Sequence, residues 1–403
     1  MNVVTPNLRF KTYSKPWEVQ ALGKLGSFLG GGTPSTENRA YWSGGIPWVS
    51  SSDIKEGDFF GINLHRFITE DAIKNSATKK VPENSLLIVS RVGVGKFSVC
   101  RHEVCTSQDF TSFTPENCSI DFIAYQLYKN KNRLINLGQG TTIKGFTTGD
   151  LASFKLHIPE KDEQQKIADF LTSVDTKISQ LTEKRRLLKD YKKGVMQQIF
   201  SQQIRFKDDD GNAFPDWEDK LLGDIATFTK GKSISKADIS IDGMTPCIRY
   251  GELYTTYGEV IESVVSATNL PIKSLLFSEA NDVIVPSSGE TQWDIATAAC
   301  VKLSDVAYSG DLTVIRTPLN GVFLSYYFNS DKKREIASLS QGSSVIHLYS
   351  THLKSLKIEV PCEAEQQKIA QFLQSLDKKI DAVNDQIKQT KLFKKGLLQQ
   401  MFV

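Results

Sequence analysis

The stretch Glu163-Gln164-Gln165-Lys166-Ile167-Ala168 recurs 202 residues later as Glu365-Gln366-Gln367-Lys368-Ile369-Ala370. The register extends to both sides of this motif and pairs Pro159 with Pro361, Asp175 with Asp377, Lys193-Gly194 with Lys395-Gly396, and Phe200 with Phe402. A weaker match pairs Arg9-Phe10-Lys11 with Arg205-Phe206-Lys207, and Trp17-Glu18 with Trp217-Glu218. An internal repeat constrains the architecture that every local signal must fit. The sequence therefore predicts two copies of one frame, related in the manner of a symmetric dimer.

The residues after each copy of the motif follow a coiled-coil pattern. Apolar residues recur every seven positions and form two predicted seams, namely Ile167, Val174, Leu181 and Leu188, and Ile369, Leu376 and Val383. No proline falls within 163–200 or 365–402, so we expect two continuous helices, each about 55 Å long. The seams favour an antiparallel coiled coil that separates two domains. The alternative is that each helix packs separately into its own domain.

Short apolar runs alternate with Gly, Pro, Asn and Ser upstream of each helix, which predicts strands, for example at 85–89, 282–285 and 312–315. Residues 125–137 and 324–339 are predicted to be helical. We expect two α+β domains with irregular sheets, whose interiors diverge in sequence. The predicted division is an N-terminal segment at 1–20, a first domain at 21–159, a central helix at 160–205, a linker at 206–220, a second domain at 221–361 and a C-terminal helix at 362–403.

Composition is that of an ordinary folded protein of more than one domain, with 403 residues, 40% hydrophobic and 24% charged. No apolar stretch is long enough to span a membrane and no signal peptide is recognised, so we expect a cytoplasmic protein without a membrane partner. Six scattered cysteines are expected to be reduced and buried. The net charge of +3 is too small to demand a nucleic-acid partner.

Polar residues able to contact DNA bases are expected on loops after the predicted strands. In the first domain they are Ser50, Ser51, Arg91, Lys96, Thr141, Thr142 and Lys144. In the second they are Arg249, Tyr250, Ser288, Glu290, Gln292, Trp293, Ser343, Ser344 and His347. Arg and Lys pair with guanine, Gln with adenine and Glu with cytosine. The alternative for each residue is an ordinary solvated loop position.

No set of residues predicts catalysis or metal binding. The run Gly93-Val94-Gly95-Lys96-Phe97 lacks the spacing of a phosphate-binding loop and has Phe where Ser or Thr would hold magnesium. Cys100, His102, Cys105 and Cys118 lack a second pair of zinc ligands, so we expect them to be buried packing residues. We therefore expect neither a catalytic centre nor a cofactor in this chain.

The run Gly31-Gly32-Thr33-Pro34-Ser35, followed by Tyr41-Trp42 and Ile46-Pro47-Trp48-Val49, resembles the opening of a target-recognition domain. Together with the two Glu-Gln-Gln-Lys-Ile-Ala helix starts, it makes nearly the whole chain similar to the specificity subunits of type I restriction-modification systems. One departure is that the second domain lacks this opening, and only Thr245-Pro246-Cys247-Ile248 aligns loosely with it.

The resemblance implies that each domain reads one half of a split site in double-stranded DNA, while the helices set the gap. It implies two modification subunits, which carry S-adenosylmethionine and methylate an adenine in each half, and restriction subunits that use ATP and magnesium. Base methylation needs a flipped base in a separate pocket, which this chain is not expected to contain. The resemblance also implies a bacterial or archaeal host.

Two other functions remain open at this point. A stand-alone DNA-binding regulator would explain two domains, although no helix-turn-helix is evident. A coiled-coil scaffold that does not bind DNA would explain the helices but not the divergent polar loops on a repeated frame. Binding to random-sequence DNA, with and without modification subunits, would separate these possibilities.

Overall fold

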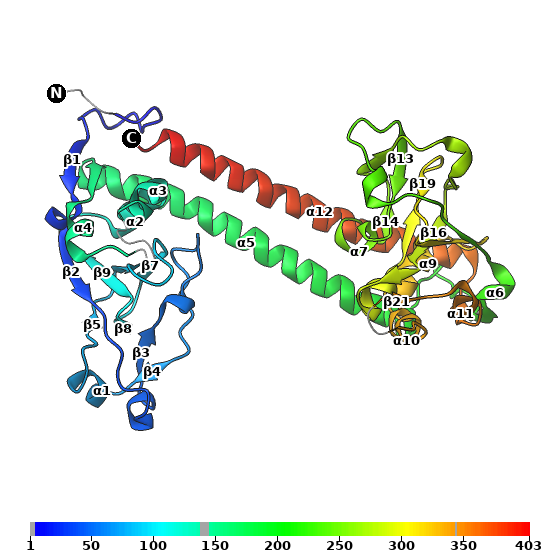
Figure 1. Cartoon of the computed structure of the whole chain (residues 1–403), viewed down its shortest axis with the longest axis horizontal. Helices are drawn as coiled ribbons and strands as arrows, with labels where there is room; N and C mark the ends of the chain where they lie inside the picture. The colour runs from blue at the N-terminus through cyan, green and yellow to red at the C-terminus, as the bar shows by residue number, and fades with distance from the viewer. Residues whose placement is uncertain (1–4, 138–144, 343–344) are drawn as a thin grey trace. The chain divides into compact units, whose positions relative to one another are not determined.

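The computed structural model describes residues 5–137, 145–342 and 345–403. The chain forms two compact units (Figure 1). The first comprises Met1–Leu181 and Gln386–Val403, and the second comprises Thr182–Asp385. Each unit therefore contains one globular domain and parts of both long helices, α5 (Lys161–Phe200) and α12 (Glu363–Gln400). Both helices are continuous, as the sequence predicts.

The first domain is built on two four-stranded sheets. The first sheet has the order β2 (Gly26–Gly30), β9 (Phe110–Pro115), β6 (Ser85–Val89) and β7 (Phe97–Cys100). The second has the order β4 (Phe67–Ile68), β3 (Ile46–Val49), β8 (Val104–Thr106) and β5 (Lys80–Val81), with β3 and β8 parallel. A separate pair, β1 (Glu18–Ala21) and β10 (Lys155–Ile158), closes the domain next to α5. All five residues of β6 are buried, which explains its continuous apolar run.

The remaining elements of this domain are short. They are η1 (Leu22–Lys24), η2 (Arg39–Trp42), η3 (Ser51–Asp53), α1 (Glu70–Lys74), α2 (Ile120–Lys129), α3 (Lys131–Ile135) and α4 (Thr148–Ser153). Thr69, Ser119 and Thr147 cap α1, α2 and α4 through their hydroxyl groups.

The second domain repeats this topology. One sheet has the order β12 (Thr227–Lys230), β20 (Leu312–Arg316), β16 (Asp282–Pro286), β18 (Ala299–Val301) and β14 (Val260–Ile261). The other has the order β15 (Ser266–Thr268), β13 (Thr245–Ile248) and β19 (Ala307–Tyr308), with β13 and β19 parallel. Two further strand pairs are β11 (Glu218–Leu221) with β22 (Lys357–Val360), and β17 (Ser288–Gly289) with β21 (Ile346–His347). Strand β13 thus takes the place of β3, as the loose sequence match suggests.

The short helical segments of the second domain are α6 (Leu222–Ile225), η4 (Lys236–Asp238), α7 (Glu252–Thr255), η5 (Ile272–Ser274), α8 (Gln292–Ile295), α9 (Gly321–Asn329), α10 (Lys333–Ser338) and α11 (Ser350–Lys354). The helices predicted at 125–137 and 324–339 are each two helices, so those two predictions are wrong in detail. Asn130 and Asn329 stand where the first helix of each pair ends. Their side-chain amides donate to the carbonyls of Gln126 and Ser325, which ends the helix locally.

The predicted seam residues are buried, with Leu188 half-buried and the other six no more than 7% exposed. Ile167 and Val174 join the core of the first domain together with Leu397 of α12 and Phe402, which follows that helix. In the second unit, Ile199 and Phe200 of α5 join a core that contains Ile369 and Leu376 of α12. The helices therefore pair antiparallel, and each domain core contains side chains from both of them. The sequence leaves two alternatives open, pairing of the helices with each other or packing of each helix into its own domain. The structure combines both.

Candidate nucleic-acid interface

A buried glutamate at the start of each long helix holds an arginine from the segment that precedes the domain. The Arg9 guanidinium donates to both carboxylate oxygens of Glu163 at 2.7 Å. Arg205 makes the same contact with Glu365 at 2.8 Å. Both glutamate side chains are at most 1% exposed, so each needs this bidentate partner. The repeated Glu and Arg therefore fasten each domain to its helix.

The next residue of the motif links the helix to the domain interior. The Gln164 side chain accepts from the Ser119 amide and donates to the Pro159 carbonyl, both at 2.9 Å. Gln366 makes the equivalent contacts with Asn320 and Pro361 at the same distance. Each glutamine thereby connects the helix start with the N-terminus of α2 or α9.

An aspartate farther along each helix joins both helices to the domain. Asp175 of α5 accepts from the Tyr125 hydroxyl at 2.8 Å and pairs with Lys394 of α12 at 2.6 Å. Asp377 of α12 accepts from the Tyr326 hydroxyl and pairs with Lys192 of α5 at 2.6 Å. Burial raises the pKa of both tyrosines, so their hydroxyls remain donors.

One edge of the first domain gathers the ends of several strands. The Val49 carbonyl, at the end of β3, accepts from the Ser107 amide at 2.9 Å. The Ser90 amide, just after β6, donates to the Asp109 carbonyl at 2.7 Å, and the Ser90 carbonyl accepts from the Phe146 amide at 3.1 Å. We call this region, formed by the chain around residues 50, 90, 107–109 and 146, the turn edge.

The second domain has the same turn edge. Here the Ile248 carbonyl accepts from Ser309, the Ser287 amide donates to Asp311, and the Ser287 carbonyl accepts from Leu348. At each turn edge a glycine lies so close to a backbone carbonyl oxygen that a side chain would not fit. An added Cβ would lie 2.1 Å from the Ser107 carbonyl oxygen at Gly31 and 2.0 Å from the Ser309 carbonyl oxygen at Gly231. The two domains therefore share the backbone arrangement of this edge, while their sequences differ here as expected.

A buried acidic residue binds the backbone of the turn edge in each domain. It also pairs with an arginine, but the arginine comes from a different sequence position in each domain. In the first domain, Asp53 accepts from the Ser50 amide at 2.7 Å and pairs with Arg66, which also lies 4.9 Å over the Trp48 ring. In the second, Glu252 accepts from the Arg249 amide and from Arg249 Nε, both at 3.0 Å. The place that Ser50 occupies in one domain is thus taken by an arginine in the other.

The structure brings several predicted residues of the first domain to the turn edge. Ser50 and Ser51 are half-buried, Arg91 is exposed and Lys96 is half-buried. Arg91 follows Ser90 directly. Thr141, Thr142 and Lys144, together with Ser343 and Ser344 of the second domain, lie outside the described residues. Arg66 belongs to this edge but was missed, because only the fold brings it to Asp53.

The predicted residues of the second domain that the structure describes fall into three groups. Arg249 and Tyr250 line a pocket of about 630 Å³ together with Lys230, Ser235 and Lys236. Glu290, Gln292 and Trp293 lie on the exposed face at the start of α8. Ser288 is buried and pairs in a strand with exposed His347, so neither residue lies on a loop as predicted.

Three lysines near this pocket were missed by sequence reasoning. Lys230, Lys232 and Lys236 are exposed, and none forms an ion pair with a described acidic residue. The sequence does contain a cluster here, with three lysines within seven positions. The long helices have a similar density of lysines, so the cluster does not stand out.

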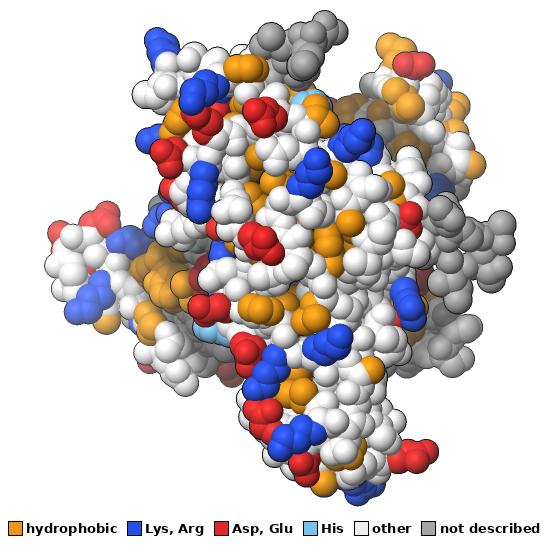
Figure 2. Space-filling model, turned by 90° about the vertical axis from the view of Figure 1, so that its left-hand side faces the viewer, with side chains coloured by type: hydrophobic (Ala, Val, Ile, Leu, Met, Phe, Trp, Pro, Cys, Tyr) orange, Lys and Arg blue, Asp and Glu red, His pale blue; other side chains and the backbone are white. Residues whose placement is uncertain are grey.

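Charges of both signs are interspersed on one face of the molecule (Figure 2). On the face drawn in Figure 2, the described Lys and Arg side chains alternate with Asp and Glu. Within the described residues, no three His, Cys, Asp or Glu side chains come together in a way that could hold a metal ion. Cys100, Cys105 and Cys118 are buried as expected, and burial raises the pKa of Cys105 to about 11. Across the described segments, no helix has both the length and the apolar character that a membrane span requires.

The family model of the type I restriction modification DNA specificity domain matches residues 14–189 and again residues 215–391. The chain belongs to this family. The two matches cover both domains and much of both long helices, in agreement with the repeat found in the sequence. Membership of the specificity family supports a DNA-recognition protein over a stand-alone regulator or a scaffold.

Specificity subunits of type I restriction enzymes are similar to this chain in sequence. The chain is 25% identical to the type I restriction enzyme MjaIX specificity subunit of Methanocaldococcus jannaschii, over 96% of this chain and 93% of that protein. It is 30% identical to the EcoR124I/EcoR124II specificity subunit of Escherichia coli over 44% of this chain and 45% of that protein.

Solved structures support the fold of this family member. The S subunit of a type I restriction-modification system from M. genitalium matches over 99% of both chains, with a TM-score of 0.62 and 16% identity. A chain from a structure of type I system assembly and conformational transition matches over 96% of this chain and 97% of that one, with a TM-score of 0.56 and 16% identity. The expected architecture of two α+β domains with a long antiparallel helix pair is confirmed.

Proposed function

We propose that this chain is the DNA-reading subunit of a type I restriction-modification complex, in which each domain recognises one half of a bipartite site in double-stranded DNA. The observation that carries the proposal is the turn edge, which both domains build with the same hydrogen bonds but furnish with different side chains. A common frame with different exposed groups suits two modules that bind similar duplex segments of different sequence.

The long helices would set the distance between the two half-sites. Helix α5 begins in the first unit and ends in the second, whereas α12 runs the other way. Continuous helices of 40 and 38 residues correspond to about 60 Å and 57 Å at about 1.5 Å per residue. The contacts of Asp175 and Asp377 would transmit this spacing to each domain, because each joins both helices to a domain tyrosine.

The chemistry would belong to partner subunits. Two modification subunits would bind S-adenosylmethionine and methylate an adenine in each half-site, and restriction subunits would supply ATP- and magnesium-dependent cleavage. This chain would act without a cofactor or catalytic centre of its own. A complex of this kind acts on DNA in the cytoplasm of a bacterium or archaeon.

The test is a domain exchange in the assembled complex. Residues 221–360 would be replaced by the second domain of another specificity subunit, and methylated adenines would be mapped by single-molecule sequencing. We expect a bipartite motif in which only one half changes. A change in both halves would reject independent half-site recognition. Tight sequence-specific binding by the chain without modification subunits would instead favour a stand-alone regulator.

A further inference from the structure

The side chain of Arg249 is held in place by a buried acid. Glu252, with its side chain 5% exposed, accepts from the Arg249 amide and from Arg249 Nε, each at 3.0 Å. It also accepts from the Ser266 hydroxyl at 2.6 Å. A guanidinium fixed through Nε has lost most of its rotational freedom, so a further contact by its terminal nitrogens costs less entropy.

The terminal nitrogens of Arg249 remain available at the pocket of the second domain. Neither Nη1 nor Nη2 hydrogen-bonds to a residue among those described, and the side chain is 28% exposed. Arg249 lines the pocket of about 630 Å³ next to Tyr250 and Gly251. A planar pair of free N–H donors on a residue that lines such a space matches the O6 and N7 acceptors of guanine in the major groove.

Exposed lysines accompany Arg249. Lys230 and Lys236 line the same pocket, and neither is paired with a described acidic side chain. Unpaired lysines of this kind attract phosphates without regard to base sequence. The pocket thus places a preorganised arginine, which can distinguish bases, beside cations that can position the DNA backbone.

The first domain lacks this arrangement at the equivalent position. Ser50 stands where Arg249 stands, and the buried Asp53 is paired with Arg66 instead. Arg66 uses the same nitrogen to contact Ser50 and Asp53, and its Nε is buried without a hydrogen-bond partner among the described atoms. An arginine that is held by a buried acid and keeps its terminal nitrogens free therefore occurs at this position in the second domain and not in the first.

We propose that Arg249 reads a guanine in the half-site of the second domain through a bidentate contact, that Glu252 positions it, and that Lys230 and Lys236 bind the adjoining phosphates. This inference rests on the proposed function and names one base and the residue that recognises it. It also explains how two domains with the same turn edge select different half-sites.

The experiment uses the chain assembled with its modification subunits and a library of random-sequence duplex DNA. The half-site of the second domain is identified as the one that changes in the 221–360 exchange. We expect that half of the wild-type motif to contain a guanine. Arg249→Ala should reduce discrimination at that single position by roughly tenfold to hundredfold and leave the other half unchanged. Arg249→Gln, which can still donate to Glu252, should lose the guanine preference while keeping the local structure.

Three further variants separate the roles. Glu252→Gln should weaken discrimination at the same guanine, because the guanidinium is no longer held by a charge. Lys230→Ala should weaken binding to all sequences alike and lower the salt dependence by about one ion. Arg334→Ala, which removes an exposed arginine from α10, should leave the motif unchanged.

The outcomes distinguish this inference from the function on which it rests. A bipartite motif that persists with full guanine discrimination in both Arg249 variants overturns the role of Arg249. A second half-site without guanine, or relaxation of both halves together, overturns it as well. A wild-type complex that selects no motif overturns the proposed function itself, and the inference with it.

Discussion

In the first unit, a carboxylate oxygen of Asp175 on α5 lies 2.6 Å from the Lys394 ammonium on α12. The side chains are 22% and 14% exposed, so water screens this ion pair only in part. Because Asp175 also accepts from Tyr125, a single carboxylate connects two helices and a domain. The repeated sequence places Asp377, Lys192 and Tyr326 in the same relationship in the second unit.

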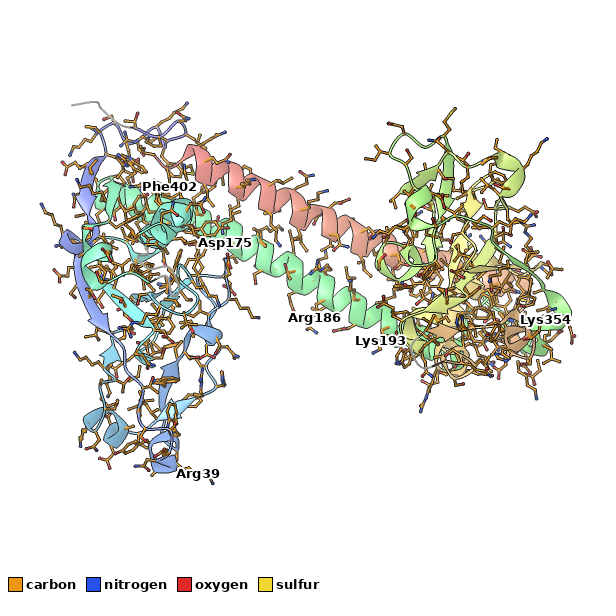
Figure 3. The ribbon with its side chains drawn as sticks, in the orientation of Figure 1. Arg39, Asp175, Arg186, Lys193, Lys354 and Phe402 are labelled. Atoms are coloured by element: carbon orange, nitrogen blue, oxygen red, sulfur yellow. The ribbon has the colours of Figure 1, made fainter. Side chains whose placement is uncertain are left out.

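Replacing Asp175 with Asn should lower the free energy of unfolding by about 1–3 kcal/mol, because Lys394 loses its counter-charge in a partly buried place. Urea denaturation of the purified chain measures this change. The control is Glu183→Gln, which breaks the solvent-exposed pair with Arg186, labelled on α5 in Figure 3. That variant should be indistinguishable from wild type. Equal effects from both substitutions would contradict a special role for Asp175.

Stability should depend on pH through Asp377. Burial raises the pKa of this carboxyl above its ordinary value, and the nearby Lys192 offsets the rise only in part. An acid with a higher pKa in the folded than in the unfolded state binds more protons when folded. Its contribution to stability is therefore largest at low pH and declines as pH rises from about 4 through the folded pKa.

Asp377→Asn should remove that decline. We expect the stability of the variant, measured relative to wild type by urea denaturation between pH 4 and 8, to improve with rising pH over the titration window. A difference between the two proteins that stays constant, or that moves in the opposite direction, would show that the buried carboxyl does not titrate as inferred.

The seam of the helix pair can be tested at Leu181, which is 4% exposed and belongs to neither domain core. Leu181→Arg would bury a charge without a partner and should lower the free energy of unfolding by about 2–4 kcal/mol. In the assembled complex it should abolish methylation of the bipartite site. Leu187→Arg is the matched control for stability, since Leu187 lies on the same helix and is 53% exposed. A cooperative transition unchanged by Leu181→Arg would count against a packed seam.

The cysteines should differ in reactivity. Burial raises the pKa of Cys105 and Cys247 to about 11 and that of Cys118 and Cys300 to about 12, and it also raises the pKa of Cys100. Cys362 alone among the six is half-buried. A thiol-specific reagent at pH 8 should therefore modify no more than one thiol per native chain.

Unfolding the chain in denaturant should expose all six thiols, and Cys362→Ser should remove the reaction of the native state. Rapid modification of two or more thiols in native Cys362→Ser would show that the domain cores open more readily than their packing indicates.

The frame of this protein was predictable because both copies use the same residue types for the same contacts. Glu163 and Glu365 each bind an arginine, and Gln164 and Gln366 each bridge the helix start to the domain, so the letters repeat. The long helices were predictable because apolar residues recur every seven positions along them. The helix breaks at Asn130 and Asn329 were missed, because apolar periodicity continues through them.

The turn edges were only partly predictable, because the two domains fill equivalent positions with different residues. The pair Ser50 and Asp53 in one domain matches Arg249 and Glu252 in the other, and no shared letter marks the correspondence. Arg66 reaches Asp53 across 13 residues of sequence, which only the fold reveals. The placement of Arg249 beside Lys230 likewise depends on strand pairing.

The core of the first domain includes Leu397, Leu398, Met401 and Phe402, and Phe402 (Figure 3) packs against Trp17 and Phe122. The Leu8 amide donates to the Gln400 carbonyl at 2.9 Å in the same region. Because these residues leave the ribosome after the whole second domain, the domain translated first is the last to complete its core. During synthesis the first domain exposes apolar surface until the C-terminal residues have been made. We therefore expect the nascent chain to bind chaperones.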